Sequence, residues 1–309
     1  MLETPIALII FNRPDTTARV FESIRAAGPK RLLVIGDGPR NGKVGELEQV
    51  QQCRQIVESV DWDCEVTTNY SDVNLGCKYR VASGLDWAFS LVESLIILED
   101  DCLPHPSFFG YCEQLLDRFW NDDRVMMISG DNFQHPSERL ADDASYYFSR
   151  WSHIWGWASW RRAWQHFDVE IETWPERKLA GDLQTIFDSN EEYGHWAQTL
   201  DRQHAGEIDT WDFPWQYACW ERQGLTILPH VNLVSNIGFR EDGTHTQDPA
   251  SHLADLPVDE IGPLVHPNKI EPNRIADRLT WERIFCPPRT VPTPQPKRRW
   301  FQRLFSSSR

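Results

Sequence analysis

The sequence has 309 residues, of which 40% are hydrophobic and 25% charged, and 46 acidic residues outnumber 31 basic ones to give a formal net charge of -15. This composition is typical of a globular protein with one large core or two smaller ones, and it excludes wholesale disorder. A surface this acidic repels the phosphate backbone, so we expect no nucleic-acid partner.

The amino-terminal apolar stretch, residues 6–11, has no basic segment before it and is too short to span a bilayer, so we expect it to be a buried strand. No other segment has a run of about 18 apolar residues, so we expect no transmembrane helix. The seven cysteines are scattered and include no CxxC pair. This pattern argues against a zinc site or a disulfide framework and favours a cytoplasmic location.

The first half of the chain alternates between short apolar runs and segments with helical spacing. The runs predict strands at residues 6–11, 32–35, 65–68, 95–98 and 125–128, and the spacing predicts helices at 16–27, 44–60, 78–92 and 107–120. Continuous apolar strands that alternate with helices predict an α/β fold with a mostly parallel sheet covered on both faces.

The second half is rich in tryptophan from about residue 145 onward. Helical spacing predicts helices at residues 156–166, 191–205 and 214–223, and residues 225–228 are expected to form a short strand. We expect this part to be a lobe packed on the sheet. Residues 287–296 contain five prolines and are typical of an extended linker.

The string LIILEDDCLP is the most informative motif in the chain. Its apolar strand ends in Glu99, Asp100 and Asp101, which places three carboxylates at the carboxyl end of a strand, the usual ligand edge of an open α/β sheet. Three adjacent like charges call for a cation, and oxygen ligands favour magnesium, manganese or calcium over zinc. Residue alternation predicts that Asp100 faces away from the other two. The alternative is a solvated acidic turn.

The segment IILEDDCLPHPSFFGYCEQLL resembles the acidic motif of glycosyltransferases with the GT-A fold, in particular the N-acetylglucosaminyltransferases of the N-glycan pathway and their bacterial relatives. The resemblance extends over residues 4–240. It implies a GT-A (Rossmann-like) fold, a nucleotide-sugar donor with uracil as its base and transfer of a hexosyl or N-acetylhexosaminyl group. It also implies that Asp101 binds Mn²⁺ or Mg²⁺, that Asp100 contacts the ribose and that Glu99 contacts the donor sugar.

Other residues at the family's positions have implied roles in donor binding. Arg13 takes the place of an Arg that contacts the nucleotide, and Asp37 that of an Asp that accepts a hydrogen bond from uracil N3. Lys78 and Arg80 lie beside a turn, where two cations suit a pyrophosphate. The alternative for Arg13 is a surface Arg in a turn, and for Asp37 an ordinary Asp-Gly turn. For Lys78 and Arg80 the alternative is a solvated helix start. The family often has a His in the helix predicted here at residues 78–92, and this chain has Gly84 to Asp86 at that place instead.

The second half supplies the implied acceptor side. Trp157 and Trp211 are the indoles that we expect to contact sugar rings, although plain core packing is the alternative. Asp212 takes the position of the catalytic base, with Asp209 as its competitor, and a helix cap is the alternative for either. His245 is a candidate metal ligand or diphosphate contact.

We therefore expect a glycosyltransferase domain at residues 1–282, with a nucleotide-side half of about 1–135 and an acceptor-side half of about 136–282, followed by a linker and tail at 283–309. Residues 297–309 are basic and aromatic, and as a helix they form one apolar stripe flanked by basic residues. They predict peripheral contact with the inner face of the cytoplasmic membrane, where a glycan or lipid-linked acceptor would be found. A disordered tail, or one docked on the acidic body, is the alternative.

Direct displacement with inversion is the mechanism that the resemblance implies. One alternative is a metal-dependent nucleotidyltransferase or phosphohydrolase, although the sequence has neither a GxxxxGK[ST] nor a GxGxxG motif. The other is a non-catalytic carbohydrate-binding or toxin-like protein on the same fold, which tryptophan would serve equally well.

Overall fold

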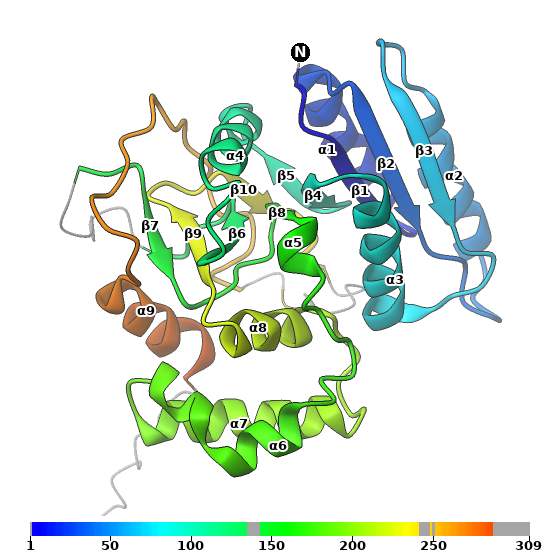
Figure 1. The fold of residues 1–309 in the computed structure, drawn as a ribbon. Coiled ribbons are helices and arrows are strands. Elements are labelled where there is room, and N and C mark those ends of the chain that lie inside the picture. Colours follow the sequence, from blue (N-terminus) through cyan, green and yellow to red (C-terminus); the bar gives the residue numbers. More distant parts are fainter. Residues whose placement is uncertain (1, 135–142, 241–247, 249–250, 287–309) are drawn as a thin grey trace, which may run out of the picture.

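A computed structural model describes residues 2–134, 143–240, 248 and 251–286, and it is built around one eight-stranded sheet (Figure 1). Four neighbouring strands are parallel to one another, β6 and β9 are also parallel, β8 is antiparallel to β4 and β6, and β7 is antiparallel to β9. The predicted α/β class with a mostly parallel sheet is confirmed. The strands in spatial order are β3 (Glu65–Tyr70), β2 (Arg31–Gly36), β1 (Ile6–Ile10), β4 (Ser94–Glu99), β8 (Trp157–Trp160), β6 (Val125–Ser129), β9 (Leu225–Pro229) and β7 (Tyr146–Ser149).

Helices cover both faces of this sheet, as the continuous apolar strands predicted. In β1, Leu8 and Ile10 pack into one core cluster, whereas Ala7 and Ile9 pack into another on the opposite face. The first cluster includes residues of α1 (Pro14–Ala27), α2 (Glu46–Glu58) and α4 (Ser107–Arg118). The second includes residues of α3 (Gly76–Leu91), α5 (Arg161–Trp164) and α8 (Asp212–Glu221).

A further helical layer lies below α8 in Figure 1, so that α8 separates the sheet from α6 (Trp174–Ala180) and α7 (Asn190–His204). Trp215 of α8 packs toward the sheet, whereas Trp220 packs against Trp151 and Trp196 in a third, tryptophan-rich cluster. The short helix α9 (Arg274–Thr280) packs against β7, and the π-helix Trp281–Phe285 that follows it contributes Trp281 to this cluster. Most of the tryptophans that mark the second half of the sequence are therefore core residues.

The helix predicted at residues 156–166 is wrong over its first half. Residues Trp157–Trp160 form β8, which is inserted between β4 and β6 and pairs Ile97 with Trp157. Trp157 points into one core cluster and Trp160 into the other, and the helix α5 begins only at Arg161. Tertiary pairing thus overrides the local pattern, and the sheet continues across the two halves that the sequence suggested.

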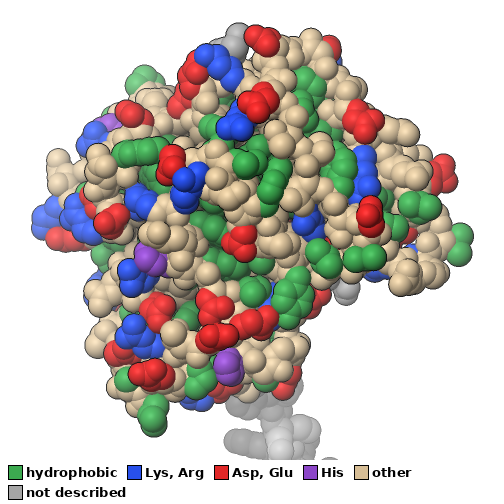
Figure 2. Space-filling model, turned by 45° about the vertical axis from the view of Figure 1, so that its right-hand side comes forward, with side chains coloured by type: hydrophobic (Ala, Val, Ile, Leu, Met, Phe, Trp, Pro, Cys, Tyr) green, Lys and Arg blue, Asp and Glu red, His purple; other side chains and the backbone are tan. Residues whose placement is uncertain are grey.

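No helix among the described residues combines the length and apolarity needed to cross a membrane. On the face shown in Figure 2, acidic and basic side chains are interspersed with apolar ones.

Arg150 lies in a buried ion cluster that ties the β7 end to the helical layer. Its Nη2 lies 2.9 Å from Glu192 Oε1 and 3.1 Å from Asp188 Oδ2, and its Nε lies 3.5 Å from Asp277 Oδ2. Burial raises the pKa of Asp277 to about 6, which reflects the cost of keeping that carboxylate charged. Arg150 is the cation shared by these groups.

We expect Arg150→Met to lower the free energy of unfolding by about 3–5 kcal/mol, because it leaves two buried carboxylates, Glu192 and Asp277, without their cation. Urea unfolding measures this change. Arg124→Met removes an exposed Arg that pairs with Asp122, and it should leave stability nearly unchanged. Equal effects of the two substitutions would contradict a structural role for the buried cluster.

Candidate active site

The acidic motif, Glu99 to Asp101, lies where the order of the parallel strands reverses. The chain runs outward from β1 to β2 and β3, and then returns to the other side of β1 with β4. The strand order thus reverses between the neighbouring strands β1 and β4, and such a switch point is the usual ligand crevice of an open α/β sheet. A cavity of about 520 Å³ opens there. Residues that line it include Phe11, Arg13, Asp37, Arg40, Asn74, Arg80, Glu99, Asp100, Asp101, Trp155, Asp209, Trp211, Asp212 and Asn236.

All three carboxylates of the acidic motif line this one cavity, so the predicted alternation of faces is wrong. The reason is that β4 ends at Glu99 and the chain turns at Asp100. Asp100 Oδ2 accepts a hydrogen bond of 3.0 Å from the backbone N–H of Phe11, which ties the motif to the end of β1. Burial, followed by the neighbouring carboxylates, raises the pKa values of Glu99 and Asp100 above their usual range.

Arg13 supplies a positive charge at the acidic motif. It is the N-cap residue of α1, immediately beyond β1, and its Nη1 lies 2.6 Å from Asp101 Oδ2. Burial alone would lower the pKa of Arg13, but the three carboxylates outweigh this effect and raise it. The sequence predicted a cation beside the three carboxylates, and in this structure Arg13 provides a positive charge there.

Asp37 lies in the cavity wall and binds the start of α3. Its Oδ1 accepts hydrogen bonds from the backbone N–H groups of Gly38 and Leu75, at 2.9 and 3.0 Å, and its Oδ2 accepts from Asn74 Nδ2 and from the N–H of Gly76. Burial raises the pKa of Asp37, and these donors oppose the rise. A nucleotide base would have to share oxygens that already accept several hydrogen bonds.

Of the two cations predicted beside the α3 turn, only Arg80 lines the cavity. Its Nη2 donates to the backbone carbonyl and the side chain of Asn69, both at 2.6 Å. Lys78 is buried, does not line the cavity and has its Nζ 2.8 Å from Glu170 Oε2. The pyrophosphate contact of Lys78 stays a prediction from the sequence, and in this structure its ammonium is paired with Glu170 instead.

The two tryptophans expected to contact sugar rings stack on each other, with ring centroids 5.5 Å apart. Both side chains are 1% exposed and belong to the same core cluster, and of the two only Trp211 borders the cavity. The structure thus matches the core-packing alternative for both tryptophans, and their contact with a sugar ring stays a prediction from the sequence. Trp155, which the sequence did not single out, does line the cavity and packs against Phe239.

Asp209 and Asp212 both line the cavity, but in different settings. Asp209 Oδ1 accepts a hydrogen bond of 3.3 Å from the backbone N–H of Lys78, in the first turn of α3. Asp212 is the first residue of α8, and its Oδ1 accepts from Thr210 Oγ1 and, at 2.8 Å, from the N–H of Phe213. The charge of Asp212 is among the causes that raise the pKa of Glu99, which places this carboxylate near the acidic motif.

Arg40, Asn74 and Asn236 are cavity residues that sequence reasoning missed. Arg40 follows the Asp-Gly turn after β2 and pairs with the buried Glu46. Asn236 ends β10 (Val234–Asn236), which pairs in antiparallel fashion with β5 (Cys102–Pro104) immediately after the acidic motif. Of these three residues, Arg40 alone could have been predicted to line the cavity, because it follows the carboxyl end of β2 in the sequence. His245 and residues 287–309 of the linker and tail lie outside the described residues.

Among the described residues, no three His, Cys, Asp or Glu side chains are arranged to hold a metal ion by themselves. The donor set fits a different mode, in which Mg²⁺ or a similar ion takes one or two carboxylates from the protein and its remaining oxygens from substrate phosphates and water. The acidic motif offers carboxylates for this mode, because Glu99, Asp100 and Asp101 all line the cavity.

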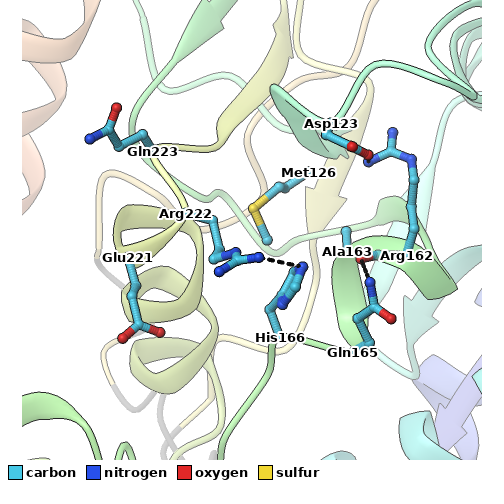
Figure 3. A pocket seen from close by; sticks show the side chains of 9 residues that line it. All are labelled: Asp123, Met126, Arg162, Ala163, Gln165, His166, Glu221, Arg222 and Gln223. Atoms are coloured by element: carbon cyan, nitrogen blue, oxygen red, sulfur yellow. Dashed lines mark hydrogen bonds and ion pairs between the residues drawn. The ribbon is translucent and has the colours of Figure 1, made fainter.

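A second cavity of about 550 Å³ is shown in Figure 3, and it shares no lining residue with the cavity at the acidic motif. Its cations are already engaged: Arg162 donates to the backbone carbonyls of Phe119, Trp120 and Val125, and Arg222 Nη2 lies 3.4 Å from His166 Nε2. No carboxylate cluster at a strand end faces this cavity, among the residues that the structure describes. The acidic cavity is therefore the candidate active site.

No protein-family model matches the sequence, and no curated protein matches it. Among solved structures, the chain is similar to UDP-glucose pyrophosphorylase complexed with UDP-glucose, with 12% identity and a TM-score of 0.27. The alignment covers 48% of this chain and 62% of that one. Because this similarity is low, the α/β assignment rests on the strand order and on the two covered faces of the sheet.

Proposed function

We propose that this chain is a metal-dependent glycosyltransferase that moves a sugar from a nucleoside-diphosphate donor to an acceptor hydroxyl with inversion. The observation that carries the proposal is the convergence of three elements on one cavity at the switch point of the sheet. These elements are the acidic motif after β4, Arg13 after β1 and Asp212 at the start of α8. The resemblance of the acidic motif to GT-A enzymes supports a UDP-sugar as the donor.

The cavity extends from the ends of β1 and β2 to the start of α8, which suits an elongated donor. Phe11, Asn74 and Arg40 lie at the β1–β2 end and would surround the nucleotide, with Arg40 and Arg13 within the same cavity to pair with the diphosphate. The sugar would then lie toward Trp211 and Asp212, at the opposite end. An indole face suits the apolar face of a sugar ring, and of the two tryptophans that line the cavity Trp155 is half-buried whereas Trp211 is 1% exposed.

In the proposed reaction, the acceptor hydroxyl oxygen forms a bond to the anomeric carbon while the bond from that carbon to the diphosphate oxygen breaks. Asp212 takes the hydroxyl proton, and the nucleoside diphosphate leaves with the bonding electron pair. A divalent ion bound by Asp101 would stabilise the charge on the leaving diphosphate as a Lewis acid. Arg13 would add a positive charge beside the same group.

We expect UDP together with Mn²⁺ to raise the unfolding temperature more than either additive alone. A ligand at about 100 times its dissociation constant adds about 2.7 kcal/mol to the free energy of unfolding. Thermal-shift assays with UDP, GDP and TDP, each with and without Mn²⁺, measure the effect and rank the bases. The same assays in EDTA serve as the control, and the absence of any shift would count against the proposal.

The products of slow donor hydrolysis separate this proposal from its alternatives. A glycosyltransferase releases a nucleoside diphosphate and a free sugar, whereas a nucleotidyltransferase or phosphohydrolase cuts within the diphosphate. A carbohydrate-binding protein releases neither. The identity of the acceptor and contact of residues 297–309 with a membrane stay predictions from the sequence.

A further inference from the structure

The ion pair between Arg13 and Asp101 engages one of the two oxygens of the carboxylate that would bind the proposed metal. Arg13 Nη1 lies 2.6 Å from Asp101 Oδ2, and the two side chains are 17% and 11% exposed. Asp101 Oδ1 has a weaker neighbour, the Cys102 thiol, whose sulfur is 3.6 Å away. The strongest partner of this carboxylate is thus the guanidinium.

The backbone at Gly238 closes one side of the pair. A Cβ atom at this position would lie 2.0 Å from Asp101 Oδ2 and 2.8 Å from Arg13 Nη1, so only glycine fits against the two charged groups. The neighbouring N–H of Ile237 donates to the backbone carbonyl of Asp101 at 2.8 Å. Among the described residues, Gly238 thus lies against Asp101 Oδ2 on one side, whereas Asp101 and Arg13 both line the cavity.

The backbone of Arg13 is fixed, although its side chain need not be. Its carbonyl accepts hydrogen bonds from the N–H and the hydroxyl of Thr17, at 3.0 and 2.7 Å, as part of the first turn of α1. An arginine side chain that rotates about this fixed point can exchange one anionic partner for another within the cavity. A diphosphate offers it a bidentate partner in place of Asp101.

We propose that Arg13 is a resident counterion of Asp101, which passes to the diphosphate when the donor binds and thereby frees Asp101 for the divalent ion. The inference rests on the proposed function. Two cations on one carboxylate repel each other, so Arg13 weakens metal binding until an anion neutralises it. Metal and nucleoside diphosphate then bind cooperatively, and the coupling is reciprocal.

The test is the binding of Mn²⁺, followed by electron paramagnetic resonance, to the full chain without nucleotide. We expect Arg13→Gln to bind Mn²⁺ at least about tenfold more tightly than the wild type, because the competing charge is gone. Arg13→Lys keeps the charge and should stay close to the wild type. Arg124→Gln removes an exposed cation that pairs with Asp122 and does not line the cavity, and it controls for a general change of charge.

Saturating UDP, corrected for the Mn²⁺–UDP complex formed without protein, should tighten Mn²⁺ binding at least about tenfold in the wild type and much less in Arg13→Gln. Arg13→Met carries the same expectation and replaces the Gln variant if the latter loses its far-UV circular dichroism. Equal Mn²⁺ affinity of the neutral variants and the wild type, or an equal effect of UDP on both, overturns the inference alone. If the wild type binds no Mn²⁺ even with UDP, the inference and the proposed metal role both fail.

Discussion

Asp101→Asn should abolish Mn²⁺-dependent nucleotide binding while the protein stays folded. The amide is a poorer ligand for a hard divalent ion and carries no charge, so the proposed metal loses its protein ligand. The fold should survive because Asn has nearly the same shape and because the backbone carbonyl of residue 101 still accepts the N–H of Ile237. Isothermal titration of UDP with and without Mn²⁺ measures the loss.

A matched control is Asp201→Asn, which removes a half-exposed carboxylate of α7 that pairs with Lys178. This variant should bind UDP and Mn²⁺ as the wild type does. Unchanged UDP affinity in Asp101→Asn, or in the wild type treated with EDTA, would remove the metal from the proposed function. In Asp101→Asn the guanidinium of Arg13 also loses its ion-pair partner. The charges of Glu99 and Asp100 still act on it.

The sheet and the acidic motif could be predicted because their signals are local. The strand before Glu99 is a continuous apolar run, and carboxylates that follow such a run must lie at a strand end. The segment of β8 carries no such signal, because its four residues alternate between two buried faces and read equally well as a helix. Only its pairing with β4 and β6, which are remote in sequence, decides its structure.

Side-chain partners were harder to predict than strand positions, because they too depend on residues that are remote in sequence. Lys78 lies close in sequence to cavity residues, but its partner is Glu170, 92 residues away. Trp157 shares its sequence neighbourhood with Trp155, and only the register of β8 sends Trp157 into the core. The role of Asp37 as a link to the start of α3 likewise depends on a turn that closes 37 to 39 residues further along the chain.

A pair of substitutions can distinguish the two candidate bases, Asp209 and Asp212. Asp209 contacts the start of α3, whereas Asp212 is the first residue of α8. Asp209 holds the first turn of α3 through the N–H of Lys78, so Asp209→Asn should mainly affect stability, by about the 1 kcal/mol typical of a lost helix cap. Asp212 lies beside Trp211 and acts electrostatically on Glu99, at the end of the cavity proposed for the sugar.

We therefore expect Asp212→Asn to lower turnover at least about a hundredfold, the range typical of losing a general base, with donor affinity nearly unchanged. Asn keeps the acceptor oxygen for the N–H of Phe213 but cannot take the proton of the acceptor hydroxyl. Single-turnover kinetics with a donor and acceptor pair found by screening separates turnover from binding, with Asp209→Asn as the matched control. A large loss in Asp209→Asn and none in Asp212→Asn would move the base to Asp209, and an anomeric configuration retained in the product would contradict direct displacement by either residue.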